Sequence, residues 1–403
     1  MAKTIKLPQL AWYGPRELEL PLPDSWQVEI CNMAGYNRLA MTDEQIRSFI
    51  TNPIGTGPIR ELAKGKNEVV IIFDDITRVT RVSRIVPFVL EELAAAGIPD
   101  TKIRFIAALG CHAAMNRIDF AKKLGEATLA RFPVFNHNPF DNCTYVGTTS
   151  YGTKVSVNAE VMKCDFKITI GSVTPQRMVV FGGGGKMILP GVSSVETIVA
   201  NHTLPGVDKI NYDMNIMRLD MEEAAKLVGL DVNIECIVNA WGETVAIFAG
   251  ALVPAHAAAI QEARAHYLTP KAEGKDIVIA NTFAKASECA SGTAVAFPSI
   301  SQRGGDVVLI GNAPQGQVVH YIGGAWGRTI RGRISIEFEV PQHVNRLIMY
   351  TEYPDIAGLM WFKESEKICQ MNNWDDVLRS LQEVYGDKAT IAVYPNADIQ
   401  HFG

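Results

Sequence analysis

The segment Glu68-Val-Val-Ile-Ile-Phe-Asp-Asp75 decides the fold class of this chain. Its apolar run, which ends at Phe73, predicts a buried strand. A helical pattern follows from Ser83 to Gly97, with Ser83 placed to cap its start and Gly97 to end it. A strand followed by a helix, repeated along a chain, predicts parallel sheets covered by helices.

The same alternation continues to the end of the chain. Further strands are predicted at 102–109, 166–171, 232–239, 276–281, 306–310, 346–351 and 390–394, and helices at 116–131, 190–201, 221–228 and 255–267. The polar segment 269–275 contains Pro and Gly and predicts a domain boundary. We therefore expect an α/β protein of two domains, each a mostly parallel sheet flanked by helices. Residues 1–270 would carry the functional groups and residues 271–403 would close over the substrate, with the active site in the cleft between them.

Composition excludes several classes of protein. With 403 residues, 47% of them hydrophobic, the chain can bury two substantial cores and is not a disordered protein. A formal charge of −5 without a basic block argues against nucleic acid or an anionic membrane as partner. The seven cysteines are scattered and form no CxxC pair, which indicates reduced thiols. Without an apolar signal core or a membrane-length apolar run, the chain is expected to be cytoplasmic.

Polar residues follow three of the predicted strands at the point where each strand ends. These are the motifs Asp74-Asp75-Ile-Thr77-Arg78, Gly110-Cys-His112 and Thr174-Pro-Gln176. Ligands of open α/β sheets bind beyond the carboxyl ends of the strands, so the three motifs predict one site. Each motif also has a purely structural interpretation: a turn or helix cap for the two aspartates, an ion pair for Arg78, and a hydrogen-bonded loop histidine for His112.

A glycine run precedes Lys186 in the segment from Phe181 to Gly191. Four glycines in a row would let a flat or bulky ligand approach the backbone closely. The run is not a phosphate-binding loop of the Walker type, because Val180 and Met187 occupy positions where that motif needs Gly and Ser or Thr. The run could also be a flexible surface loop, and His202, further along, could simply stabilise a helix C-terminus.

Together these motifs resemble the nickel-dependent lactate racemase family. The residues that carry the resemblance are, in order, Asp75, Thr77, Arg78, Gly110, His112, Gly183, Gly184, Gly185, Lys186, Pro190, Gly191 and His202. The family binds a nickel-pincer nucleotide, a pyridinium mononucleotide that holds nickel through one ring carbon and two sulfurs. The resemblance covers most of residues 65–270 and weakens beyond them.

The resemblance implies a role for each motif. Lys186 would be the covalent tether of the cofactor, beside the glycines 183–185, and His202 would be the protein ligand to nickel. Asp75, Thr77 and Arg78 would face the nucleotide phosphate and the substrate carboxylate. Arginine suits a carboxylate because its planar fork binds two oxygens. His112 would take the hydroxyl proton while a hydride leaves the carbinol carbon of a 2-hydroxy acid.

The chain departs from the family pattern on the substrate side. Gln176 stands where the family's lactate racemases have a second histidine, and Val79 and Ala113 replace a proline and an arginine. In the second domain, Ser291 and Ala294 stand in place of a glutamine and a lysine. We therefore expect a larger or sugar-acid-like substrate rather than lactate. Gln176 would hydrogen-bond a substrate oxygen, and Lys285 is a candidate substrate contact that could complete the proton relay.

The resulting prediction is a racemase or epimerase of a 2-hydroxy acid, an isomerase, with a nickel-pincer nucleotide attached at Lys186. Its partners would be a small hydroxy acid and, transiently, the proteins that make the cofactor. Two alternatives remain open at this point. One is a transferase that uses Asp74 and Asp75 to bind magnesium and a nucleotide, and the other is a binding protein without catalytic activity.

Overall fold

A computed structural model describes residues 3–323, 337–363 and 365–403. The chain forms two compact units. The larger unit consists of Arg38–Ala263 with the short segment His320–Ile322, and the smaller unit consists of Met1–Asn37, Arg264–Val319 and Gly323–Gly403. The expected division at residue 270 therefore differs from these units mainly in the first 37 residues. They join the smaller unit because strand β3 (Gln27–Ile30) pairs in parallel with β18 (Thr390–Tyr394).

The larger unit is built on a mostly parallel sheet of six strands. In spatial order they are β13 (Thr244–Gly250), β12 (Val232–Val238), β9 (Phe166–Ser172), β4 (Val69–Asp74), β5 (Ile103–Ala108) and β6 (Val134–Asn136). Strand β4 is buried along its whole length, as its apolar sequence predicts. Only β13, at one edge, runs antiparallel to its neighbour.

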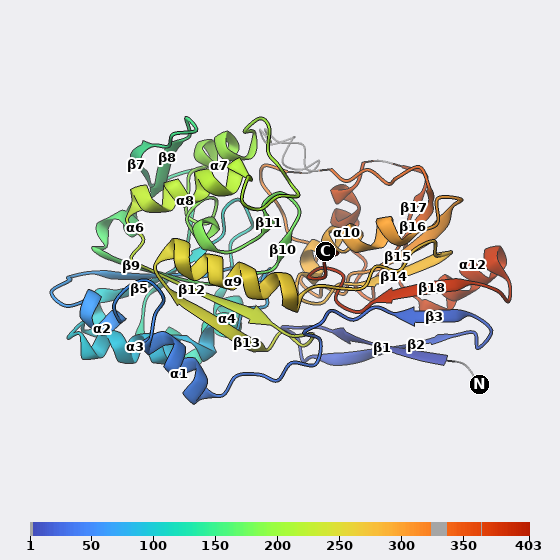
Figure 1. Ribbon diagram of the computed structural model, residues 1–403, viewed down its shortest axis with the longest axis horizontal. Helices are drawn as coiled ribbons and strands as arrows, with labels where there is room; N and C mark the ends of the chain where they lie inside the picture. Colours follow the sequence, from blue (N-terminus) through green and yellow to red (C-terminus); the bar gives the residue numbers. More distant parts are fainter. Residues whose placement is uncertain (1–2, 324–336, 364) are drawn as a thin grey trace. The chain divides into compact units, whose positions relative to one another are not determined.

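Helices cover both faces of this sheet. Helices α1 (Asp43–Thr51), α2 (Ile59–Leu62) and α3 (Val86–Ala95) lie on one side, and α6 (Ala159–Lys163), α7 (Val195–His202) and α8 (Ile216–Val228) on the other (Figure 1). The remaining elements of the unit are α4 (Arg117–Leu124), α5 (Glu126–Arg131), α9 (Leu252–His266, which ends beyond the unit), the hairpins β7 (Cys143–Thr148) with β8 (Lys154–Asn158) and β10 (Pro175–Gln176) with β11 (Val180–Phe181), and the 3-10 turns η1 (Val82–Arg84), η2 (Asp100–Lys102) and η3 (Gly184–Met187).

Several helix boundaries differ from the sequence-based expectations. Helix α3 begins at Val86 after a 3-10 turn, so Ser83 does not cap it. The helix expected over 116–131 is divided at Gly125, whose φ of 80° ends α4. The cap of α7 is Ser194, whose side chain accepts a hydrogen bond from the Thr197 amide, so this helix begins after Pro190 rather than at it.

The smaller unit also has a parallel sheet of six strands. Besides β18 and β3 they are, from the other edge, β17 (Ile368–Met371), β16 (Val344–Tyr350), β15 (Gly305–Ile310) and β14 (Ile277–Asn281). Its other elements are the hairpin β1 (Lys3–Gln9) with β2 (Arg16–Leu22), α10 (Thr293–Ala296), α12 (Trp374–Tyr385), η4 (Ala286–Gly292), η5 (Phe297–Ser299) and η6 (Ile356–Trp361).

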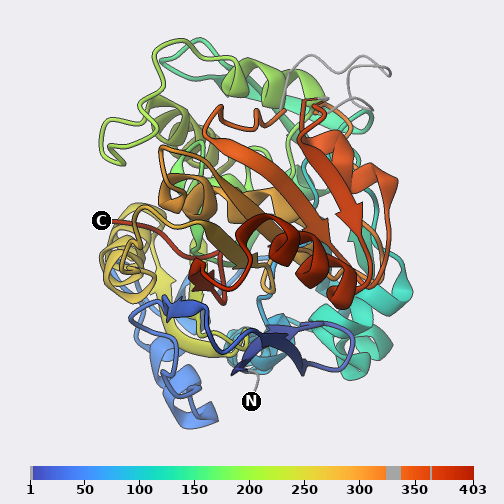
Figure 2. The same cartoon turned by 90° about the vertical axis from the view of Figure 1, so that its right-hand side faces the viewer.

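Alternate residues of β14 pack into two different cores of the smaller unit. Ile277 and Ile279 face a core that includes α12 and the β1–β2 hairpin, and Figure 2 shows α12 in front of this sheet. Val278 and Ala280 face the other core, formed with the η4–α10 segment. A strand covered on both sides must be apolar at every position, which explains the unbroken Ile-Val-Ile-Ala sequence. The expected α/β class with mostly parallel, helix-flanked sheets is confirmed.

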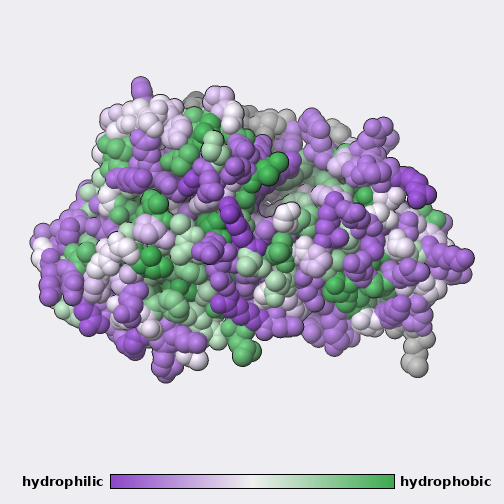
Figure 3. All heavy atoms as spheres, in the orientation of Figure 1, coloured by the Kyte–Doolittle hydropathy of each residue, from purple (hydrophilic) through white to green (hydrophobic). Residues whose placement is uncertain are grey.

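The visible surface mixes hydrophilic and hydrophobic residues (Figure 3). Within the described residues, no helix is long and apolar enough to cross a membrane. The cysteines among these residues are all free thiols.

Candidate active site

The ends of β4 and β5 bring Asp75 and His112 together. These strands are parallel neighbours, so the residues that follow them emerge at the same edge of the sheet. Nδ1 of His112 lies 2.6 Å from Oδ2 of Asp75. Burial alone would raise the pKa of Asp75, but the attraction to His112 and the hydrogen bonds from His112 and Thr77 lower it below its ordinary value. Because Asp75 is a carboxylate at neutral pH, Nδ1 of His112 is the protonated nitrogen and Nε2 is the basic one.

Thr77 and Arg78 complete this turn. The amide of Thr77 donates to Oδ1 of Asp75 at 2.9 Å, and Nη1 of Arg78 donates to Oγ1 of Thr77 at 3.0 Å. Asp75 and Thr77 are buried, whereas Arg78 is half-buried. The turn therefore holds the half-buried Arg78 beside the Asp75–His112 pair, where its guanidinium can meet an anion.

Lys123 supports the same turn from beneath, a role that the sequence did not reveal. Its ammonium donates to Oδ1 of Asp74 at 2.6 Å and to the carbonyls of Arg78 and Thr80 at 3.1 Å each. The lysine is fully buried, so burial lowers its pKa, and burial raises the pKa of Asp74. Both aspartates of the Asp-Asp pair are thus engaged by protein groups, Asp74 by Lys123 and Asp75 by His112. This arrangement does not favour the alternative in which the pair binds magnesium.

The glycine run is bonded to both neighbouring motifs. The amide of Gly182 donates to the Thr174 carbonyl at 2.9 Å, and the amide of Gly110 donates to the Gly191 carbonyl at 2.9 Å. The strand ends that carry Gln176 and His112 are therefore fixed directly to the segment that carries Lys186. The glycine run thus lies beside two of the three strand-end motifs, those of Gly110 and Thr174, within the larger unit.

Close contacts with neighbouring protein atoms explain why most positions of this run are glycine. A Cβ on Gly183 would overlap Oε1 of Glu235, and one on Gly184 would lie 2.8 Å from the His256 ring. A Cβ on Gly185 would lie 2.6 Å from the Met221 carbonyl oxygen of α8. Contacts with the protein therefore account for glycine at these three positions without a ligand. They let the 3-10 turn η3 pack tightly against the protein.

A buried pair of Glu235 and His256 lies under this turn. Glu235, on β12, is completely buried, and His256, on α9, is 2% exposed. Nδ1 of His256 lies 2.8 Å from Oε2 of Glu235, and Oε1 of the same carboxylate accepts the amide hydrogen of Gly184. The carboxylate thereby joins β12, α9 and the backbone that leads into Lys186. Charged hydrogen bonds of this kind in a buried setting hold geometry tightly.

The positive charge of Lys186 acts on the buried imidazole of His202. Burial and the positive charge of Lys186 lower the pKa of His202 to about 4. Its Nδ1 is buried, and an interaction with the backbone of Ile198 partly opposes the lowering of the pKa. A neutral imidazole is suited to be a metal ligand, and nickel accepts imidazole nitrogen. Burial and the charge of Lys186 disfavour the cationic form of His202 that stabilisation of the helix end would need.

Gln176 and Lys285 are less clearly placed for the expected roles. Oε1 of Gln176 accepts the amide hydrogens of Met178 and Val179 at 2.7 and 3.0 Å, so this oxygen closes its own β-hairpin. Only its amide nitrogen remains for a substrate oxygen. Lys285 belongs to the smaller unit, where it is 4% exposed and lies near the buried Asp398. Burial raises the pKa of Asp398 to about 6, an effect that the attraction to Lys285 opposes.

A second imidazole lies beside His112. His320 pairs with His112 in an antiparallel bridge, and their ring centroids are 5.3 Å apart at an interplanar angle of 70°. No feature of the sequence indicates this contact, because His320 follows no strand end and matches no family motif. Only the return of the segment His320–Ile322 to the larger unit brings it here.

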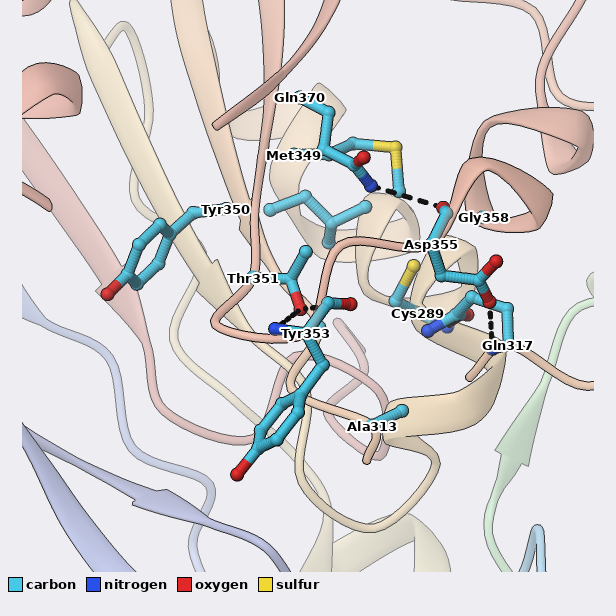
Figure 4. A pocket seen from close by; sticks show the side chains of 12 residues that line it. Cys289, Ala313, Gln317, Met349, Tyr350, Thr351, Tyr353, Asp355, Gly358 and Gln370 are labelled. Atoms are coloured by element: carbon cyan, nitrogen blue, oxygen red, sulfur yellow. Dashed lines mark hydrogen bonds between the residues drawn. The ribbon is translucent and has the colours of Figure 1, made fainter. Parts of the chain in front are cut away.

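The smaller unit has a pocket of its own at the ends of β15 and β16 (Figure 4). Asp355 and Gln317 face each other there, and the backbone N–H of Gln317 donates to Oδ2 of Asp355 at 2.6 Å. The free volume of about 10 Å³ is at the lower limit for one water molecule.

Among the described residues there is no cluster of three or more His, Cys, Asp or Glu side chains that could hold a metal. A nickel ion would thus need donor atoms from the cofactor in addition to those of protein side chains.

Comparison with known proteins identifies the family. Residues 13–212 match the model of the lactate racemase N-terminal domain. A lactate racemase of Thermoanaerobacterium thermosaccharolyticum is 30% identical over 277 residues, which are 66% of this chain and 64% of that protein. A lactate racemase of Lactiplantibacillus plantarum is 29% identical over 234 residues, 56% of this chain and 55% of that protein. The matched region thus spans less than two thirds of the length of these curated relatives.

Solved structures share the fold over a longer span. The lactate racemase apoprotein of Thermoanaerobacterium thermosaccharolyticum superposes with a TM-score of 0.73 at 22% identity, over all of both chains. A Thermotoga maritima protein superposes with a TM-score of 0.66 at 17% identity, over 91% of this chain and all of that one. Residues 13–212 therefore belong to the lactate racemase N-terminal domain family, and the whole chain shares the fold of the solved lactate racemase apoprotein.

Proposed function

We propose that this chain is a racemase or epimerase of a 2-hydroxy acid that uses a nickel-pincer nucleotide attached to Lys186. The observation that carries the proposal is the neighbourhood of Lys186 and His202. At the positions of the family's tether and nickel ligand, the positive charge of a lysine acts on an imidazole whose Nδ1 is buried. When bound, the cofactor would supply a hydride acceptor and donor.

The chain's own residues would handle the substrate and its proton. Arg78 would bind the carboxylate of the acid, because its guanidinium is half-buried at the edge of the Asp75 turn. His112 would accept the hydroxyl proton on Nε2, since its Nδ1 is held by Asp75. Asp75 would then stabilise the imidazolium that forms. The amide nitrogen of Gln176 would donate to a substrate oxygen.

The substrate would be larger or more polar than lactate. Gln176 and Ala113 are smaller or less basic than the residues that the family's lactate racemases have there, and Ser291 and Ala294 stand in place of a glutamine and a lysine. A polyhydroxylated acid would use the additional space and offer hydroxyls to these neutral groups. Loading of the cofactor would need transient contact with the proteins that make it, in the cytoplasm.

Two variants test the proposal directly. Lys186→Ala, expressed with the cofactor-making proteins, should lack the covalent adduct in an intact-mass spectrum and should have no activity. His202→Ala should keep the adduct but contain less nickel by elemental analysis. A normal adduct on Lys186→Ala would overturn the tether, and unchanged nickel in His202→Ala would return His202 to a structural role.

A further inference from the structure

The proposed reaction needs an acid–base group at two positions, and Gln176 cannot be one of them. In the two epimers of a 2-hydroxy acid, the hydroxyl and the side chain exchange places when the carboxylate and the departing hydrogen stay fixed. The hydroxyl oxygen therefore occupies two different positions in the site. His112 can serve one of them, while the neutral amide of Gln176 does not act as a base at neutral pH.

His320 lies where a second base could act. The antiparallel bridge between residues 112 and 320, together with a 2.9 Å hydrogen bond from the Tyr321 amide to the Cys111 carbonyl, fixes its backbone beside the end of β5. The ring of Tyr321 packs edge-on against Phe140, with centroids 5.8 Å apart, and anchors the segment from its other side. The imidazole of His320 is therefore held in place by contacts within the larger unit.

The orientation of the two rings separates their roles. Asp75 holds Nδ1 of His112, so this ring cannot turn without losing a charged hydrogen bond. His320 meets it at an interplanar angle of 70°, so the two rings direct their nitrogens along different lines. His320 is half-buried as a residue, and its Nδ1 is buried. Two imidazoles 5.3 Å apart can thus face two positions of one oxygen.

We propose that His320 is the second proton-transferring residue of this site and serves the epimer that His112 does not. This inference rests on the proposed function. The tethered cofactor would supply the acceptor and donor of the hydride, with its two electrons, for the carbinol carbon. One imidazole would take the hydroxyl proton as the hydride leaves, and the other would give a proton to the oxygen when the hydride returns to the opposite face of the 2-keto acid.

The test measures each half-reaction separately. The equilibrium constant fixes the ratio of the overall racemisation rates in the two directions, so those rates cannot show which histidine serves which epimer. Cofactor-loaded protein is mixed in single turnovers with D-gluconate, D-mannonate, D-lactate or L-lactate, and the cofactor absorbance is recorded. The first two acids are epimers at carbon 2 and represent the polyhydroxylated class. We expect His320→Phe, which keeps an aromatic edge contact, to slow bleaching by one gluconate-class epimer by about 100-fold or more. The other epimer should change by only a few fold.

Controls assign the effect to proton transfer. His112→Gln should give the opposite pattern, slowing the epimer that His320→Phe spares. Tyr321→Phe keeps the ring contact with Phe140 and should leave both half-reactions unchanged. In the apoprotein, selective histidine labelling should show a nuclear Overhauser effect between the rings of His112 and His320, and His320→Phe should melt at nearly the same temperature as the wild type.

The outcomes separate this inference from the proposed function. If the loaded wild type is bleached by none of the four acids, the proposed function fails and the role of His320 fails with it. If the wild type is bleached but His320→Phe changes neither epimer, or slows both equally, the function stands and His320 is not the second base. Absence of the ring–ring signal in the apoprotein would also overturn the assignment.

Discussion

Gly185→Ala should be strongly destabilising and should also disturb the tether. A methyl group at this position would lie 2.6 Å from the Met221 carbonyl oxygen, 2.7 Å from its carbon and 2.9 Å from the Glu222 amide nitrogen. All three atoms belong to the backbone of α8, so no side-chain rotation can relieve the overlap. The shortfall from an ordinary van der Waals separation is roughly 1 Å. Either η3 or the helix must move by about that amount.

The magnitude follows from the cost of overpacking. Insertion of a methyl group into a closely packed region costs about 1–3 kcal/mol, and a backbone neighbour places this site near the upper end. For a folding unit of this size, about 3 kcal/mol corresponds to a melting temperature lower by roughly 6–12 °C. Because Lys186 is the next residue, the same displacement should reduce the fraction of protein that carries the adduct.

Gly182→Ala is the matched control for this experiment. Its Cβ would find the Thr174 carbonyl at 3.7 Å and the Lys186 side chain at 4.0 Å, which are ordinary contacts. The expected change in the free energy of unfolding is within about 0.5 kcal/mol. Calorimetry of both apoproteins and intact-mass spectra of both loaded proteins provide the readouts. If Gly185→Ala melts with the wild type, or if the two variants are equally destabilised, the packing argument for the glycine run is refuted.

Three further predictions concern the support of the site, its pH dependence and its substrate. Lys123→Met should destabilise the protein by about 3–5 kcal/mol in denaturant titrations, because it leaves Asp74 buried without its charged partner; a loss below about 1 kcal/mol would contradict this. The pKa of His202 is about 4 in the folded protein, below its unfolded value of about 6.5. The neutral His202 side chain therefore contributes about 3 kcal/mol to the free energy of unfolding of the apoprotein above pH ~6.5, and this contribution is lost as the pH falls toward 4. His202→Gln should flatten the plot of unfolding free energy against pH over that range. Loaded wild type should racemise D- and L-lactate poorly, and Gln176→His should increase that rate; fast racemisation by the wild type would refute the substrate argument.

The strand ends of the larger unit could be predicted from the sequence. Apolar runs of the kind found in β4, β5 and β9 predict buried strands, and residues just past parallel strands must lie at one edge of the sheet. Asp75 and His112 were therefore expected at the same edge. In the structure, Nδ1 of His112 lies 2.6 Å from Oδ2 of Asp75. Helix boundaries were predicted less well, because a cap such as Asn215 at the start of α8 decides them locally.

The residues that support the site could not be predicted, because their partners are distant in sequence. Lys123 bonds to Asp74 across 49 residues, and Glu235 bonds to the Gly184 amide across 51. Neither belongs to a motif, and each is recognised only once the strands and helices are packed. The packing that requires glycine could not be predicted for the same reason, since the atoms that exclude a side chain at Gly184 come from α9.

The unit to which the first segment of the chain belongs could not be predicted either. Residues up to Asn37 precede the first strand of the larger unit, so sequence order assigned them to it. The parallel pairing of β3 with β18 places them in the smaller unit instead. A strand pair formed between the two ends of a chain leaves no local signal in the sequence.

An intact-mass spectrum of the wild-type chain expressed with the cofactor-making proteins tests the proposed attachment at Lys186. The mass should increase by that of the tethered nickel-pincer nucleotide, and peptide mapping should place the increase on Lys186. The same chain expressed without those proteins should have its unmodified mass. An unmodified mass after coexpression, or an adduct on any other residue, would contradict the proposed function.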